Sequence, residues 1–91
     1  MAARTPIQFT LRITNTTPRP QTVMLEPWTG EYRLPPGVPL DLLVEGTPST
    51  PLQIEIEEDR VVVFSFDTTD ALITAYRDGR QLRSEHDSPG A

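Results

Sequence analysis

The sequence lacks cysteine and lysine and contains a single histidine, His86. Without cysteine the chain has no disulfide, no thiolate metal site and no cysteine nucleophile. A blue-copper site needs two histidines and a cysteine, and one histidine leaves only carboxylates to complete a zinc site. We therefore expect no metal and no cofactor, and a fold held by packing and hydrogen bonds.

Long apolar runs are also missing. No stretch approaches the roughly 18–20 apolar residues of a membrane-spanning helix, and residues 1–6 lack the apolar run of a signal peptide. The net charge is -5, and no local cluster of the eight arginines offsets it. An acidic chain is repelled by phosphate backbones. We expect a soluble cytoplasmic protein that binds neither nucleic acid nor membrane.

Short alternating runs of apolar and polar residues are abundant, and ten prolines disfavour long helices. Period-two alternation is typical of half-buried strands. It predicts strands at residues 7–15, 21–26, 31–34, 40–45, 52–57, 60–66, 71–76 and 80–82. Residues 60–66 are apolar on both faces, which indicates a central strand. Residues 72–76 also fit a helical turn, but the Asp78-Gly79 hairpin signal that follows favours a strand.

Seven or eight short strands at spacings of about 8–12 residues indicate an all-β fold. We expect a small antiparallel β-sandwich of general immunoglobulin-like or cupredoxin-like shape, or a small barrel, with no helix of note. A single domain would span residues 6–83, with flexible termini at 1–5 and 84–91. The expected core consists of Ile7, Phe9, Leu11, Ile13, Val23, Leu25, Leu42, Val44, Ile54, Ile56, Val61, Val63, Phe64 and Ile73.

Residues 25–37 hold the only tryptophan, Trp28, among prolines and glycines. Pro27 ends a strand because proline cannot donate to a ladder. Gly30 is expected to bend the chain with φ > 0, and Pro35-Pro36-Gly37 has the chemistry of a type II turn.

Trp28 has two interpretations. It is either a plug over one end of the core or part of an exposed platform for carbohydrate or a small ligand, together with Tyr32 and Arg33.

Catalytic motifs are absent: there is no Gly-x-Ser-x-Gly elbow, no P-loop and no Gly-x-Gly-x-x-Gly. Glu26 and Glu31 flank Trp28 and could form a carboxylate pair of glycosidase type, but so small a domain rarely builds the cleft that mechanism needs. Asp67 and Asp70 could supply oxygens to calcium or bond within their own turn. We expect no enzyme.

The order Glu26-Pro27-Trp28, Tyr32, Leu34, Pro36-Gly37 resembles a segment, "EPW…Y.L.PG", of small uncharacterised bacterial β-sandwich proteins. The similarity continues through an acidic strand pair and a Tyr-Arg-Asp-Gly hairpin, and it would cover residues 7–83. It implies a compact bacterial β-domain without an assigned activity, and it transfers no catalytic residue.

The leading hypothesis is a non-catalytic protein-interaction module. Edge strands of sheets are natural places for strand addition, by an unknown protein partner or by a second copy of the chain. The alternative is a carbohydrate-binding or small-ligand-binding module that uses Trp28 and Tyr32, and a small hydrolase that uses Glu26 and Glu31 is a third possibility.

Overall fold

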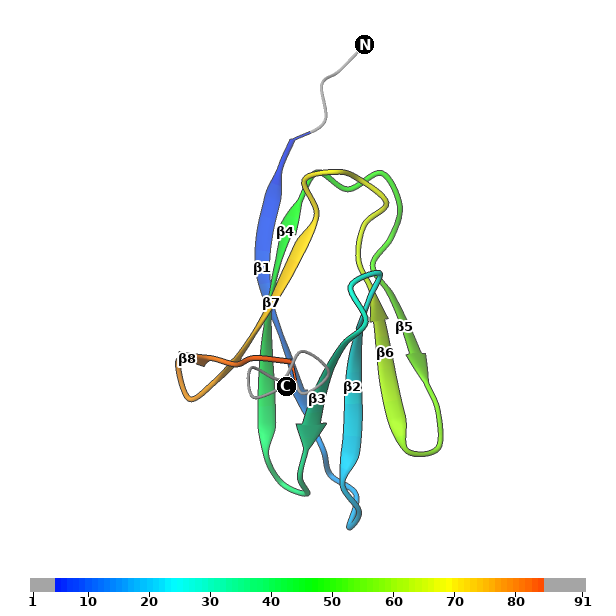
Figure 1. Ribbon diagram of the computed structural model, residues 1–91. Coiled ribbons are helices and arrows are strands. Elements are labelled where there is room, and N and C mark those ends of the chain that lie inside the picture. Colours follow the sequence, from blue (N-terminus) through cyan, green and yellow to red (C-terminus); the bar gives the residue numbers. More distant parts are fainter. Residues whose placement is uncertain (1–4, 85–91) are drawn as a thin grey trace, which may run out of the picture.

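The computed structural model describes residues 5–84, which form eight strands and no helix (Figure 1). The strands are β1 (Ile7–Thr14), β2 (Gln21–Glu26), β3 (Gly30–Leu34), β4 (Pro39–Gly46), β5 (Gln53–Ile56), β6 (Arg60–Phe64), β7 (Leu72–Arg77) and β8 (Arg80–Gln81). Each expected strand is found within one or two residues of its predicted bounds. His86 and most of the expected flexible termini, namely residues 1–4 and 85–91, lie outside the described residues.

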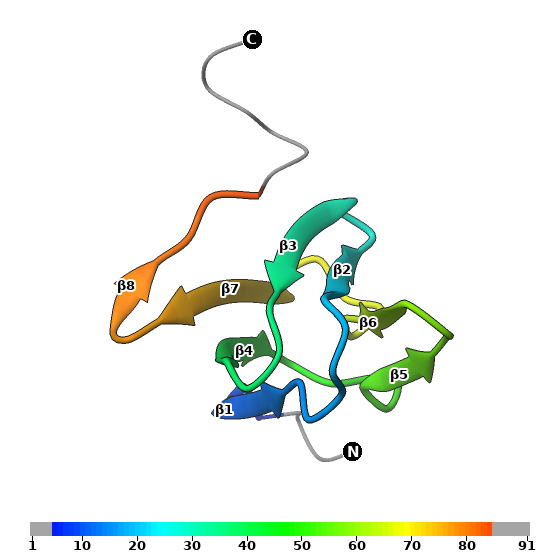
Figure 2. The same ribbon diagram turned by 90° about the horizontal axis from the view of Figure 1, so that it is seen from below.

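The strands form two four-stranded sheets that pack against each other as a β-sandwich (Figure 2). One sheet has the order β1-β4-β7-β8 and the other β3-β2-β6-β5. All neighbours are antiparallel except β2 and β6, which pair in parallel. Strand β6 therefore has a neighbour on both sides, which confirms the central position predicted from its two apolar faces. The all-β sandwich prediction is also confirmed.

The core lies between the sheets and is built from inward-facing side chains of the central strands. Its buried members are Val23, Leu25, Leu34, Leu40, Leu42, Val44, Val63, Phe66, Ile73 and Ala75. Burying each large apolar side chain contributes about 1.5–3 kcal/mol relative to leaving it exposed.

Several residues of the expected core are not buried. Ile7, Phe9, Ile54 and Ile56 are exposed, because they belong to β1 and β5, the outermost strands of their sheets. Alternation predicts the face on which a side chain lies, but it does not tell whether another strand covers that face.

Phe64 is a second error in the expected core. It is only half-buried, and its register partners Gln53 and Glu26 place it on the outer face of its sheet. Phe66, two residues later, is 5% exposed and supplies the aromatic ring of the core.

The turns follow their sequence chemistry, with one exception. Gly37 has a φ of 76° and the Val38 N–H donates to the Pro35 carbonyl at 3.2 Å, so the predicted type II turn is confirmed. Asp78 and Gly79 both have positive φ, at 53° and 78°, as a type I′ hairpin turn requires.

Gly30 does not have positive φ, so the expected bend at that residue was wrong. Thr29 adopts the left-handed conformation instead, with a φ of 56°, and its hydroxyl donates to the Trp28 carbonyl at 2.6 Å. Gly30 is the first residue of β3, where a Cβ would lie 3.3 Å from the ring of Tyr32. Its role is to let that ring approach the backbone.

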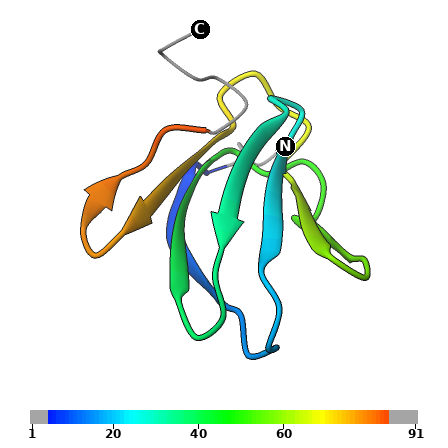
Figure 3. The same cartoon turned by 60° about the horizontal axis from the view of Figure 1, so that its bottom comes forward.

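Asn15 is the one buried polar side chain among the described residues, at 4% exposed. Its amide nitrogen donates to the carbonyls of Arg19 at 2.7 Å and Leu34 at 2.9 Å. Its side-chain amide oxygen accepts from the backbone N–H and the hydroxyl of Thr17. The backbone carbonyl of Asn15 accepts from the Gly37 N–H at 2.7 Å. Asn15 thereby joins the β1–β2 and β3–β4 turns, which lie side by side in Figure 3.

Replacing Asn15 with alanine should lower the free energy of unfolding by about 2–4 kcal/mol, because it leaves buried carbonyls without donors. Urea unfolding measures the change. Thr10→Ala, at an exposed position of the preceding strand β1, is the control, with an expected change within about 0.5 kcal/mol. A loss below 1 kcal/mol for Asn15→Ala would contradict this role.

Candidate functional site

Trp28 lies in the turn between β2 and β3 and is 41% exposed. It is not a member of the buried core cluster. This exposure favours the exposed interpretation of Trp28 over the buried plug.

Tyr32 and Arg33 line a pocket of about 310 Å³ to which Trp28 does not contribute. Arg77, Leu82 and Arg83 complete this pocket together with Pro35. Burial raises the pKa of the Tyr32 hydroxyl above its ordinary value. The structure therefore places Tyr32 and Arg33 beside Arg77 and Arg83 in one pocket.

Glu26 and Glu31 lie on the outer face of their sheet. In the β2–β3 register Glu31 is opposite Met24, which shares its face with Glu26. Glu31 borders a polar depression with Arg60 and Glu57, but Glu26 does not. The two carboxylates thus do not face each other across an enclosed cleft of the kind that glycoside hydrolysis requires.

Hydrogen bonds of Asp70 join the β6–β7 loop to the β4–β5 loop, at the end of the sandwich opposite Asn15. Its carboxylate accepts from the Thr47 N–H at 3.1 Å and from the Thr47 hydroxyl at 2.6 Å. These hydrogen bonds lower the pKa of Asp70 below its ordinary value. Within residues 5–84 no three His, Cys, Asp or Glu side chains gather as a potential metal site.

One side of the sandwich is closed by hydrogen bonds that join β3 to β7 and to the segment after β8. The Arg77 guanidinium donates to the Arg33 carbonyl at 2.9 Å, and the Glu31 N–H donates to the Ser84 hydroxyl at 2.7 Å. Ser84, which was expected in the flexible tail, thus holds the segment after β8 against β3. This segment protects the β3 edge.

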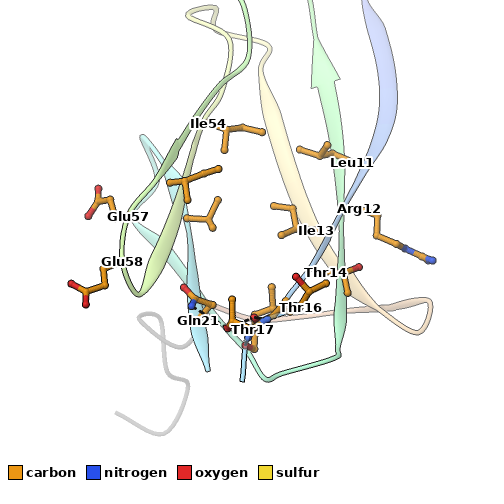
Figure 4. A pocket seen from close by; sticks show the side chains of 14 residues that line it. Leu11, Arg12, Ile13, Thr14, Thr16, Thr17, Gln21, Ile54, Glu57 and Glu58 are labelled. Atoms are coloured by element: carbon orange, nitrogen blue, oxygen red, sulfur yellow. Dashed lines mark hydrogen bonds between the residues drawn. The ribbon is translucent and has the colours of Figure 1, made fainter. Parts of the chain in front are cut away.

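The opposite side of the sandwich is open between the edge strands β1 and β5. A groove of about 580 Å³ lies there, with Leu11 and Ile13 on one wall and Ile54, Ile56 and Val61 on the other. Figure 4 shows Leu11 and Ile13 pointing toward Ile54 across it. We call this feature the open groove.

The apolar walls of the open groove are unusually accessible for inward-facing residues. Ile54 is 43% exposed and Ile56 is 82% exposed. Their register partners, Val63 and Val61, lie on the inner face of the sheet, so both isoleucines point toward the sandwich interior. A further strand at this side would bury them.

The backbones beside the open groove are also unpaired on one side. Strand β1 pairs only with β4, and β5 only with β6. Neither strand contains a proline, which would block pairing at its free edge. The groove thus combines exposed apolar side chains with two sets of available backbone N–H and C=O groups.

Polar residues surround the open groove. Asn15, Thr16, Thr17 and Gln21 line it near the β1–β2 turn, and Glu57 and Glu58 lie at its β5 rim. Glu57 is paired with Arg60 at 2.7 Å.

Sequence reasoning assigned the walls of the groove to the core and missed the site. The available signal is the acidic character of β5, where the isoleucines alternate with Gln53 and Glu55 and three more acids follow. Charged residues are typical of an edge strand.

Comparisons with protein-family models, curated proteins and solved structures find no match for this chain. A search for membrane-spanning helices finds none among the described residues.

Trp28 provides a direct test of its own environment, because it is the only tryptophan. We expect red-shifted emission that acrylamide quenches readily, and a loss of less than about 1.5 kcal/mol for Trp28→Ala. Leu25→Ala is the buried reference and should cost about 2–5 kcal/mol. Blue, protected emission with an equally large loss for Trp28→Ala would contradict the exposed position.

Proposed function

We propose that this chain is a non-catalytic protein-interaction module of the cytoplasm that receives an extended segment in the open groove. The observation that carries the proposal is the exposure of Ile54 and Ile56 on the inner face of an edge strand. Inner-face residues of a sandwich are normally covered by the opposite sheet. Their exposure indicates a surface that a partner covers.

Strand addition fits both components of the open groove. An added strand takes its affinity from main-chain hydrogen bonds to a free edge and its specificity from alternate side chains that enter pockets. Strands β1 and β5 supply the free edges, and their apolar walls accept the alternate side chains. Burying a side chain as exposed as Ile56 contributes up to about 1.5–3 kcal/mol.

A charge in the groove should abolish binding without unfolding the protein. We expect Ile56→Glu to lose at least tenfold in the yield of captured partner from an extract of the native host. Leu72→Glu is the matched control, because Leu72 is 48% exposed and does not line the groove. The captured partner is quantified by mass spectrometry.

Equal capture by wild type, Ile56→Glu and Leu72→Glu would contradict the proposal. Thermal melting should show that both variants remain folded, since both positions are exposed.

A second candidate function, small-ligand binding, is favoured by the pocket at Tyr32. Arg33, Arg77 and Arg83 line it without an acidic residue, in a chain whose net charge is -5. The Nε of Arg77 is buried there without a hydrogen-bond partner. Guanidinium groups suit carboxylates and phosphates, to which they donate in pairs.

The small-ligand function predicts binding of an anion at Arg33. We expect citrate or phosphate to shift amide resonances around Tyr32 in a titration, and Arg33→Gln to weaken this binding at least threefold. Arg80→Gln removes an exposed arginine that does not line the pocket and should have no effect. Shifts that are absent, or equal in both variants, would reject this function.

A further inference from the structure

We infer that the occupant of the open groove is a second copy of the same chain, bound so that β1 of each copy pairs with β5 of the other. The inference rests on the proposed function and names its partner. It follows from the position, level and charge of the two free edges.

Both free edges lie on the same side of the sandwich, as Figure 2 shows. Consider a two-fold axis at the open side of the sandwich, parallel to the strands and midway between the planes of the two sheets. Rotation about this axis brings each sheet of the second copy into line with the other sheet of the first. It therefore places β5 of the second copy beside β1, and β1 of the second copy beside β5. Both pairings form at once, and each four-stranded sheet becomes part of an eight-stranded one.

The other edges of the sandwich are poor alternatives for pairing. Strand β8 has only two residues, and the edge of β3 is covered by contacts from Arg77 and Ser84. The open side is thus the place where the protein has long, accessible edges.

The positions of the two strands along their common direction agree with this arrangement. Strands β1 and β5 run in the same direction (Figure 1), so their pairing between copies is parallel, like that of β2 and β6. Leu11 and Ile54 lie at the same level of the groove (Figure 4), and the axis keeps this level. Arg12 then lies beside Glu55 of the second copy, on the outer face.

Arg12 has donors available for that contact. Its Nε–H and one N–H of its Nη2 donate to the Asp41 carboxylate at 2.7 and 3.0 Å. The Arg12 side chain remains 64% exposed. A guanidinium carries five N–H groups, so three remain for a second carboxylate. Glu55 has no cationic partner among residues 5–84, and its carboxylate accepts a hydrogen bond from the Gln53 side-chain amide at 2.9 Å.

The apolar side chains of the groove complete one another in the same arrangement. Leu11 and Ile13 of one copy become neighbours of Ile54 and Ile56 of the other, on the inner face of a continuous sheet. The two cores join across the axis, and Ile56, 82% exposed in the single copy, becomes an inner residue of the pair.

Pairing of like edges satisfies these requirements less well. Joining β5 to β5 brings together two copies of the segment 55–59, which contains four acids and no base, and like charges on adjacent strands repel. Joining β1 to β1 alone leaves Ile54 and Ile56 uncovered. Only the unlike pairing both neutralises charge and covers the apolar walls.

Charge reversal provides the test. Light scattering and native mass spectrometry should show a concentration-dependent dimer for the wild type. Arg12→Glu and Glu55→Arg should each weaken dimerisation at least tenfold, because each places like charges at both contacts. An equimolar mixture of the two variants should form a heterodimer, because both of its contacts then join opposite charges.

Arg80→Glu is the control for net charge and should leave the dimer unchanged. Restored association in the mixture shows by itself that both variants are folded. Ile56→Glu is a second variant of the groove, which disturbs its apolar wall and leaves Arg12 and Glu55 in place. It should yield a monomer.

Three results would overturn the inference: a wild type that stays monomeric at millimolar concentration, a dimer that both charge variants retain, or a mixture that does not associate. If the wild type is monomeric yet captures a different protein that Ile56→Glu loses, the inference fails and the proposed function stands. If it is monomeric and Ile56→Glu changes no capture, both fail.

Discussion

The hydrogen bonds of Asn15 are the constraint on which the two-sheet arrangement depends. The chain crosses from one sheet to the other after β1 and returns after β3, and Asn15 joins these two crossings from a buried position. A buried amide that satisfies its donors and acceptor fixes one geometry, because other arrangements leave polar groups unpaired. Asn15 also lines the open groove, so the same contacts that join the sheets set the floor of the candidate site.

The two sides of the sandwich differ in how they treat the exposed edge of a sheet. On one side Arg77 and Ser84 contact β3 and cover its edge. On the other side β1 and β5 keep their edges free, and the inward-facing Ile54 and Ile56 stay in contact with solvent. Arg12 and Glu55 place one charge of each sign on these edges. Charged edge residues oppose indiscriminate pairing. Because the charges on β1 and β5 have opposite signs, they oppose the pairing of β1 with β1 and of β5 with β5, but not the pairing of β1 with β5.

The candidate site could be predicted only in part. The sequence pointed to residues 25–37 because they hold Trp28, and the structure places Trp28 on an exposed turn, where it does not line the pocket of Tyr32 and Arg33. The open groove is formed by residues that alternation assigns to the core. Leu11 and Ile54 are 43 positions apart in the chain, and nothing local indicates that no strand lies between them. The hydrolase hypothesis depended on Glu26 and Glu31 meeting in a cleft, and the β2–β3 register places them on an outer face.

The sequence by itself determined the strands and most of the turns, because these depend on local chemistry. Alternation selects the inward face of each strand, Pro36-Gly37 and Asp78-Gly79 select their turn types, and the apolar run at 61–64 indicates a central strand. Only the tertiary structure decided which strands became edges, since strand order depends on contacts between distant segments. That order made β1 and β5 the boundary of the open side, and it turned four residues of the expected core into exposed ones.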